Sequence, residues 1–179
     1  MVRDIRTVFL DRDGVLNEKA PEGGYVWRSK DFRVLGGVPE AIARLNRAGI
    51  RVIVVTNQRG IALGRYTLTD IDELHAEFQA LLAAQGAHID AFYVCPHGYG
   101  ECNCRKPLPG LFEQAVAEFP EIQAQTSLMI GDSAVDMEFG RRLGMRTILI
   151  RGGGLEGVPA DLRCDSLQDA VNALLPGHG

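Results

Sequence analysis

Strand-length apolar runs alternate with amphipathic segments along the chain, and this alternation constrains the fold more than any other feature. The runs are rich in Val and Ile and almost continuously apolar, which is typical of strands buried on both faces of a parallel sheet. They predict strands over Arg6–Leu10, Arg51–Thr56, Ala91–Val94, Ser127–Ile130 and Thr147–Ile150.

The intervening segments carry apolar residues at helical spacing and end at Gly or Pro. Thr69 is the expected N-cap of the second helix, and Pro109 is expected in the first turn of the third. Five strand–helix units with short links predict a single α/β domain over residues 1–179, a three-layer, Rossmann-like fold with a doubly wound parallel sheet. The predicted helices cover Val38–Ala48, Asp70–Gln85, Leu108–Phe119, Val135–Leu143 and Leu167–Leu175.

Charge, hydropathy patterning and the first residues of the chain argue against several classes of function. The 179 residues have a formal net charge of −4, which disfavours non-specific binding to nucleic acid. The apolar runs are too short to span a membrane, and the first residues lack the layout of a signal peptide. We therefore expect a cytoplasmic monomer that acts on a small molecule and binds no nucleic acid and no membrane.

Two aspartates, Asp11 and Asp13, follow the first predicted strand and precede Gly14. Open parallel sheets bind ligands at the carboxyl ends of their strands, and the bend permitted by Gly14 would turn both carboxylates into that crevice. Two close carboxylates repel each other unless a cation lies between them, and Mg²⁺ prefers oxygen ligands. Taken alone, the pair fits solvated acids at a strand end equally well.

Three further polar motifs occur after predicted strands. One offers a hydroxyl and two carboxamides suited to phosphate oxygens, one a lysine in a chain that has only three, and one two more aspartates. Each has an ordinary explanation when considered alone, namely a polar turn, a solvated basic pair or the cap of a helix. In chain order the residues are Thr56, Asn57 and Gln58, then Lys106, then Asp132 and Asp136, the last placed to order the loop before the next helix.

Together, the four motifs resemble those of the haloacid dehalogenase-like phosphatases, in which DxDG, Thr, Lys and GDxxxD occur in this order. The resemblance implies that Asp11 is a nucleophile that forms an aspartyl-phosphate. Asp13 would act as the general acid and then as the general base. Thr56 and Lys106 would hold the phosphoryl oxygens. Asp132, with Asp11 and the main-chain carbonyl of Asp13, would bind Mg²⁺.

Three of the four cysteines lie within ten residues, together with a histidine. In a cytosolic chain this clustering indicates a metal site rather than disulfides. Three thiolates and one imidazole suit tetrahedral Zn²⁺, and four protein ligands leave no open position, so the ion would be structural. The predicted ligands are Cys95, His97, Cys102 and Cys104, whereas the remote Cys164 is expected to be a small core residue.

The CPH…CxCRKP arrangement around these ligands is similar to that of the D-glycero-D-manno-heptose 1,7-bisphosphate 7-phosphatases and the related histidinol-phosphatase domains. This resemblance implies Mg²⁺-dependent removal of the 7-phosphate of the sugar bisphosphate, a step in the synthesis of heptose precursors of lipopolysaccharide. A chain of this length has no room for a cap domain, so the rim of the site would select the substrate. The expected substrate-binding residues are Gly24, Tyr25, Asn57, Gln58, Arg59 and Arg105.

Three alternative functions stay open on the sequence. A histidinol-phosphate phosphatase would favour an acidic rim, whereas the predicted rim has more Arg than acid. A nucleic-acid 3'-phosphatase shares the fold, but the chain shows no basic stripe. A non-catalytic zinc-bearing module would lack Asp11, Asp13 or Lys106, and all three are present.

Overall fold

The strands form one six-stranded parallel sheet. The computed structural model describes residues 4–150 and 155–175, so the glycine turn at 152–154 lies outside the described residues. The strands are β1 (Thr7–Leu10), β2 (Arg51–Asn57), β3 (Ala91–Cys95), β4 (Ser127–Gly131), β5 (Arg146–Ile150) and β6 (Leu162–Cys164). Their order in the sheet is β3-β2-β1-β4-β5-β6. The order reverses direction at β1, which places a topological switch point between β1 and β4.

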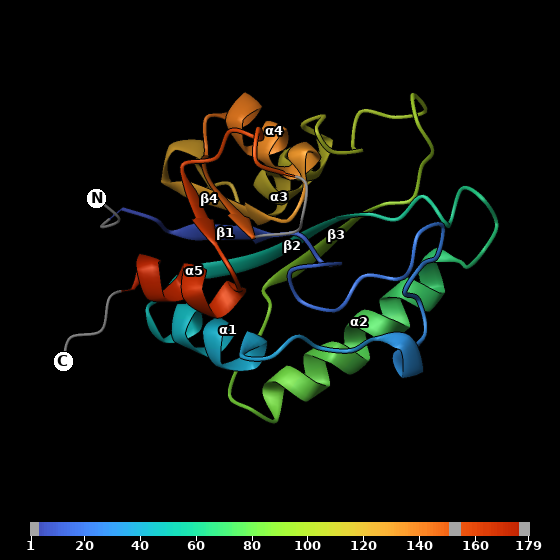
Figure 1. Cartoon of the computed structure of the whole chain (residues 1–179), viewed down its shortest axis with the longest axis horizontal. Helices are drawn as coiled ribbons and strands as arrows, with labels where there is room; N and C mark the ends of the chain where they lie inside the picture. The colour runs from blue at the N-terminus through green and yellow to red at the C-terminus, as the bar shows by residue number, and fades with distance from the viewer. Residues whose placement is uncertain (1–3, 151–154, 176–179) are drawn as a thin grey trace.

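Helices cover both faces of the sheet, which confirms the predicted doubly wound α/β class (Figure 1). One face packs against α1 (Val38–Arg47), α2 (Leu68–Ala83) and α5 (Leu167–Leu174), and the other against α3 (Gly110–Glu118) and α4 (Ala134–Leu143). Two 3-10 turns, Ser29–Asp31 and Ala124–Thr126, complete the described elements. None of the helices in the described part of the chain has the length and apolar character needed to cross a bilayer.

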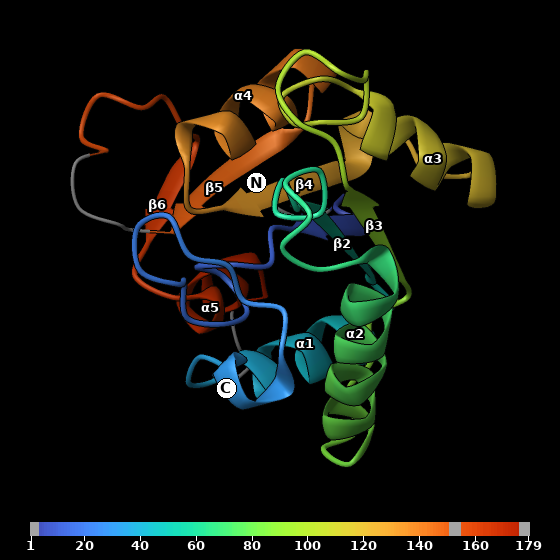
Figure 2. The same cartoon turned by 90° about the vertical axis from the view of Figure 1, so that its right-hand side faces the viewer.

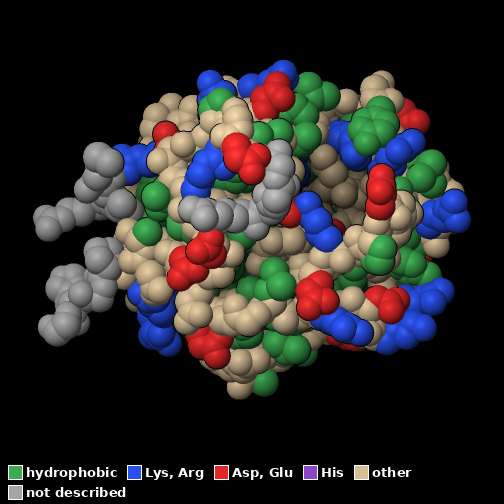
Figure 3. Space-filling view, viewed as in Figure 1, with side chains coloured by type: hydrophobic (Ala, Val, Ile, Leu, Met, Phe, Trp, Pro, Cys, Tyr) green, Lys and Arg blue, Asp and Glu red, His purple; other side chains and the backbone are tan. Residues whose placement is uncertain are grey.

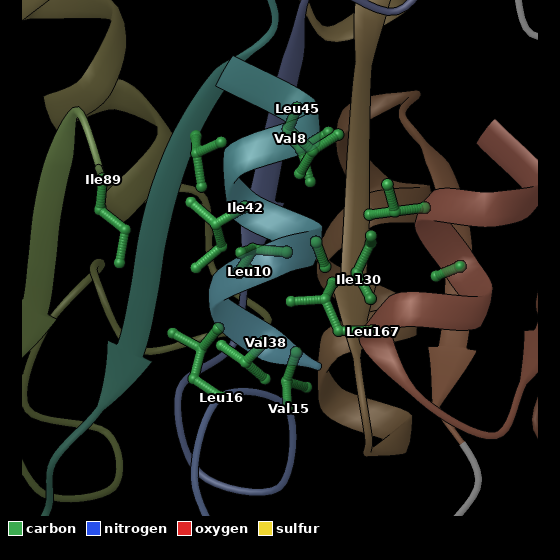
Figure 4. Packing of buried hydrophobic residues seen from close by; sticks show 14 of the residues in the cluster. Val8, Leu10, Val15, Leu16, Val38, Ile42, Leu45, Ile89, Ile130 and Leu167 are labelled. Atoms are coloured by element: carbon green, nitrogen blue, oxygen red, sulfur yellow. The ribbon is translucent and has the colours of Figure 1, made fainter. Parts of the chain in front are cut away.

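Alternating side chains of β1 supply both hydrophobic layers. Val8 and Leu10 are fully buried in the cluster that includes Ile42 of α1, as Figure 4 shows. Phe9 points to the opposite face, where its ring centroid lies 5.7 Å from that of Phe112 in α3. Because successive strand residues point to opposite faces, one short strand is packed from both sides and holds the following residues rigidly at the edge of the sheet.

The structure differs from the predicted elements at β6 and at the start of α2. Strand β6 was not predicted, because three residues at the edge of a sheet are too short to show a hydrophobic period. Helix α2 begins two residues earlier than predicted, and its N-cap is Thr67 rather than Thr69. The Thr67 hydroxyl accepts a hydrogen bond from the Asp70 N–H while the Asp70 carboxylate accepts one from the Thr67 N–H, so a capping box fixes the start.

The start of α3 also differs from the prediction. The helix begins at Gly110, and Pro109 is its N-cap rather than a residue of its first turn. A cap residue precedes the first helical position, and the missing N–H of proline costs nothing there. Cys164 is buried in the core cluster next to α5, in agreement with the expectation that it is a small core residue.

The carboxyl ends of β1, β2 and β3 lead into the long loops of the chain. Figure 2 looks onto the side of the molecule where these loops gather. Within the described residues, no separate cap domain is inserted above them. The edge of the sheet is therefore covered by the loops alone.

His75 makes the stability of the fold sensitive to acid. Its ring is buried, stacks on Phe92 with centroids 4.4 Å apart, and has no hydrogen-bond partner among the described residues. Burial, with a smaller effect of Arg12, lowers the pKa of His75 from 6.5 to about 3. The unfolded chain therefore binds the proton first, so this contribution to stability is complete above pH 6.5 and is lost as the pH falls toward 3.

In the wild type, His75 should make the free energy of unfolding about 2 kcal/mol larger at pH 7 than at pH 5. We expect His75→Phe to remove this difference. Urea unfolding of the wild type and the variant at both values measures this difference. Phe78→Leu is the matched control, because it alters a buried side chain of the same helix without removing a titratable group. Parallel pH dependences for His75→Phe and the wild type would contradict the assignment.

Candidate active site

The Lys106 ammonium group lies at the centre of the candidate active site. Its Nζ donates hydrogen bonds to Asp11 Oδ1 at 3.0 Å and to Asp136 Oδ1 at 2.6 Å. Lys106 comes from the loop after β3, Asp11 from the end of β1 and Asp136 from the first turn of α4. Burial opposes the charge on Lys106, but Asp11 and Asp136 outweigh this effect and raise the pKa of its ammonium group.

Negatively charged side chains outnumber positively charged ones around Asp11. Burial raises the pKa of the Asp11 carboxyl to about 7, Asp136 adds to the rise, and Lys106 acts in the opposite direction. One ammonium group shared between two carboxylates therefore leaves the charge of Asp11 incompletely balanced. A further cation beside Asp11 would stabilise its ionised form.

The two oxygens of Asp132 have different surroundings. Asp132 Oδ2 pairs with Lys19 Nζ at 2.5 Å, whereas Oδ1 is buried and has no hydrogen-bond partner among the described residues. Carboxylate oxygens of Asp11, Asp132 and Asp136 all lie within 4.8 Å of one another. A buried carboxylate oxygen without a partner is costly unless a cation binds it. The donor set therefore fits a hard divalent cation such as Mg²⁺.

Asp136 holds the loop that carries Asp132. Its Oδ2 accepts hydrogen bonds from the backbone N–H groups of Asp132 and Ser133 at 3.3 and 3.2 Å, and from the Ser133 hydroxyl at 2.6 Å. Because its Oδ1 binds Lys106, both Asp136 oxygens are engaged. The prediction that Asp136 orders this loop is confirmed.

Gly14 lies where the chain passes closest to Asp132. Its φ of +90° belongs to the left-handed region, and a Cβ atom here would lie 1.9 Å from Asp132 Oδ2. Both the backbone conformation and the lack of space require glycine. The same Cβ would also lie 2.8 Å from the Lys19 side chain.

Asp13 has surroundings quite unlike those of Asp11. Its Oδ1 accepts hydrogen bonds from Arg12 Nη2 at 3.1 Å and from Asn17 Nδ2 at 2.9 Å. Its Oδ2 accepts from Arg12 Nε at 3.2 Å and from Gln58 Nε2 at 3.0 Å. Guanidinium and amide donors thus surround Asp13, whereas Asp11 faces an ammonium group and two carboxylates.

Polar residues at the end of β2 and just after it contact Asp13 and the backbone of Lys106. The Thr56 hydroxyl accepts a hydrogen bond from Gln58 Nε2 at 2.8 Å. The Asn57 side chain pairs with the backbone of Lys106 in both directions, at 3.1 and 3.0 Å. Gln58 is only 2% exposed, and the Tyr66 hydroxyl donates to its Oε1 at 2.6 Å. Gln58 therefore lies behind Asp13, where its side-chain amide contacts Asp13, Thr56 and Tyr66.

The other predicted rim residues lie toward solvent. The guanidinium carbons of Arg59 and Arg105 each lie 4.5 Å from the ring centroid of Tyr99, which is 69% exposed. Tyr25 meets the Tyr66 ring edge-on, with centroids 5.7 Å apart, and Gly24 beside it is exposed. The loops after β1, β2 and β3 thus contribute aromatic and basic groups to the mouth of the site.

The four predicted zinc ligands converge in the loop after β3. Cys95 Sγ lies 3.6 Å from Cys102 Sγ, Cys102 Sγ lies 3.4 Å from Cys104 Sγ, and Cys104 Sγ lies 3.3 Å from His97 Nδ1. Cys95 Sγ and His97 Nδ1 are 3.8 Å apart. Ligands of tetrahedral Zn²⁺ at their usual bond lengths are about 3.5–3.8 Å apart. The donor set therefore fits Zn²⁺.

Several residues of the site were not predicted. Arg12, Asn17, Lys19 and Tyr66 all contact predicted residues directly. Only Lys19 had a usable signal, because the chain contains three lysines and one of them follows the first motif closely. The directions of the other three depend on tertiary packing.

Comparisons with known proteins agree with this geometry. A family model described as HAD-hydrolase-like matches residues 103–170. The chain is 38% identical over 150 residues to a D-glycero-beta-D-manno-heptose-1,7-bisphosphate 7-phosphatase of Pseudomonas putida, covering 83% of this chain and 84% of the relative. It is 36% identical over 176 residues to a D-glycero-alpha-D-manno-heptose-1,7-bisphosphate 7-phosphatase of Mycobacterium tuberculosis, covering 96% and 91%.

A solved structure extends the agreement to the fold. It is the crystal structure of a D,D-heptose 1,7-bisphosphate phosphatase from B. bronchiseptica complexed with magnesium and phosphate. The two chains have a TM-score of 0.88 and 30% sequence identity over 96% of this chain and 99% of the other. The chain therefore belongs to the D-glycero-D-manno-heptose-1,7-bisphosphate 7-phosphatase family of HAD-like hydrolases.

Proposed function

We propose that the chain is a cytoplasmic, Mg²⁺-dependent phosphatase that removes the 7-phosphate of D-glycero-D-manno-heptose 1,7-bisphosphate. The observation that carries the proposal is the arrangement of two aspartates at the end of β1. Asp11 is paired with the buried Lys106, and Asp13 is held separately by guanidinium and amide donors. One carboxylate is thus available as a nucleophile and the other for proton transfer.

In the first step, an Asp11 carboxylate oxygen attacks phosphorus and the bond from phosphorus to the sugar oxygen breaks. Asp13 gives its proton to that leaving oxygen, and Asp11 becomes an aspartyl-phosphate. In the second step, Asp13 takes a proton from water as the water oxygen attacks phosphorus. The bond between phosphorus and Asp11 breaks, which returns the free carboxylate and releases inorganic phosphate.

The remaining site residues stabilise charge and position the phosphoryl group. Lys106 faces Asp11, and Asp136 and Asn57 fix its two ends. Thr56 offers a buried hydroxyl at the end of β2. Mg²⁺, held by Asp11, Asp132 and the main-chain carbonyl of Asp13, would neutralise charge on the phosphoryl oxygens when bound.

A structural Zn²⁺ held by Cys95, His97, Cys102 and Cys104 is part of the proposal. The Arg105 backbone N–H donates to Cys102 Sγ at 3.3 Å, and an Arg105 guanidinium nitrogen donates to the His97 carbonyl at 3.4 Å. Lys106 is the next residue. The ion would therefore set the positions of a rim residue and of the central lysine.

The rim supports a bisphosphate as substrate. Arg59 and Arg105 both lie at the mouth of the site, where guanidinium groups can bind a second phosphate bidentately. The ammonium group of histidinol phosphate would gain nothing from them. The molecular face in Figure 3 shows acidic and basic side chains interspersed, an arrangement that does not favour a nucleic-acid substrate.

The nucleophile is tested by Asp11→Asn. An amide cannot attack phosphorus, so we expect phosphate release to fall by about ten-thousandfold or more while fold and zinc content persist. The exposed Asp72→Asn on α2 is the matched control and should keep full activity. Phosphate release with Mg²⁺ and circular dichroism make the comparison. Substantial turnover by Asp11→Asn would remove Asp11 from this role.

The substrate is tested by comparing kcat/KM for heptose 1,7-bisphosphate, histidinol phosphate and fructose 1,6-bisphosphate. Both anomers of the heptose belong in the series, because the relatives include enzymes named for each. We expect the heptose to be preferred about a hundredfold, or about 2.7 kcal/mol of transition-state binding. A clear preference for histidinol phosphate would overturn the proposed substrate.

A variant at the rim links this preference to structure. Arg105→Ala should lower the preference for the bisphosphate over the monophosphate by about 10–100-fold, because a charge-assisted contact to the distal phosphate is lost. Arg47→Ala, an exposed arginine in the last turn of α1, is the control. An unchanged preference in Arg105→Ala would exclude Arg105 from distal phosphate binding.

Zinc is tested by Cys104→Ser. We expect metal analysis to find about one zinc per wild-type chain and little in the variant. Phosphate release should fall about tenfold or more, because Lys106 follows the last ligand by two residues. Cys164→Ala, in the core away from the loop, should keep its zinc and activity. Zinc-free wild-type protein with full activity would contradict the structural role.

A further inference from the structure

Arg12 is a charged side chain without solvent exposure, located between the two reactive aspartates. Its Nε and Nη2 bind the two oxygens of Asp13, and Nη2 also donates to the Val26 carbonyl at 2.5 Å. Its Nη1 is buried and has no hydrogen-bond partner among the described residues. Burying a guanidinium group that is only partly paired costs several kcal/mol, and its attraction to a partly exposed carboxylate returns little. A contribution to the stability of the fold therefore does not explain why the Arg12 guanidinium group is buried here.

The Asp13 carboxylate is fixed from two sides. Each oxygen has one donor from Arg12 and a second from a neutral amide, Asn17 for Oδ1 and Gln58 for Oδ2. Gln58 is itself held by the Tyr66 hydroxyl. Among these donors only Arg12 binds both oxygens, and its planar fork matches the carboxylate plane. Rotation of the carboxylate would break both contacts at once.

Part of the Asp13 side chain nevertheless faces solvent. It is 27% exposed, although Arg12 behind it is fully buried. A leaving oxygen or a water molecule can approach on this exposed side, where it would take the place of one of the neutral amide donors. Proton transfer needs the donor and acceptor atoms within hydrogen-bond reach, so small rotations of the carboxylate reduce its efficiency.

We propose that Arg12 is a positioning residue that holds Asp13 in the orientation needed for proton transfer in both steps. This inference rests on the proposed function, in which Asp13 is the general acid and base. Among the described hydrogen bonds and ion pairs, Arg12 binds Asp13 and the Val26 carbonyl but not the nucleophile Asp11. It acts through the direction in which Asp13 presents its oxygens.

The leaving group decides whether the first step needs Asp13, whereas the second step needs Asp13 with every substrate. A sugar alkoxide needs the Asp13 proton to leave, whereas p-nitrophenolate leaves without one. Hydrolysis of the aspartyl-phosphate needs Asp13 as a base for either substrate. If Asp13 is misoriented, the first step with p-nitrophenyl phosphate stays fast and the second becomes slow, so the phosphorylated enzyme accumulates.

The test is rapid-mixing kinetics of Arg12→Met with Mg²⁺ and p-nitrophenyl phosphate. We expect a burst of about one p-nitrophenolate per chain, followed by steady turnover about a hundredfold below the wild type. Heptose bisphosphate should show the same loss without a burst. Arg12→Lys, which keeps the charge but not the fork, should show a burst and an intermediate loss of about tenfold.

Arg51→Met is the matched control, because Arg51 is the first residue of β2, at the end of the strand away from the site, and its guanidinium group packs on Phe119. It should show wild-type turnover and no new burst. Equal losses on both substrates without a burst in Arg12→Met would indicate a merely structural role and overturn the proposal. If Arg12→Met does not fold, full activity of Arg12→Lys would overturn it as well.

A crystal structure of the folded variant gives a readout that does not need activity. We expect the Asp13 carboxylate to adopt more than one orientation in Arg12→Met or Arg12→Lys, with Asp11 and Lys106 unmoved. A single orientation equal to that of the wild type would overturn the proposal. A wild-type protein inactive on every phosphate ester would instead contradict the proposed function, and the orientation of Asp13 would still decide the role of Arg12.

Discussion

The ion pairs of Lys106 with Asp11 and Asp136 are the contacts on which the rest of the active site depends. The three residues come from distant parts of the chain, and their charges meet in a buried place at the carboxyl edge of the sheet. A buried ammonium group is tolerated only when its partners are correctly placed. The packing of β1 between two hydrophobic layers, the cap of α4 and the loop after β3 must all be in position for this pairing to form.

Two aspartates separated by one residue acquire different chemistry because they face different partners. Asp11 has one ammonium group and two neighbouring carboxylates, so its charge is poorly balanced and its oxygens attract cations. Asp13 has four donors and an exposed edge. The difference arises from the turn after β1, which places Asp11 against Lys106 and Asp13 against Arg12. It does not require different residue types.

The sequence predicted the sheet and the approximate positions of the motifs because both depend on local signals. Continuous apolar runs identify buried strands, and parallel strands bring their carboxyl ends to one edge. The directions of side chains there depend on contacts between distant segments, which explains why the contacts of Arg12 and Gln58 with Asp13 were not predicted. The cap of α2 was ambiguous for a different reason: Thr67 and Thr69 are each followed by an aspartate three residues later, so both fit the same capping pattern.

The close approach of Gly14 to Asp132 makes volume as important as charge at this edge. A Cβ atom at Gly14, in the turn after β1, would lie 1.9 Å from the carboxylate oxygen that pairs with Lys19. Even an alanine would have to push Asp132 and the Lys19 side chain aside, and Asp132 is anchored through its backbone to Asp136. The effect of one uncharged methyl group would thus reach the residues around the central lysine by displacement alone.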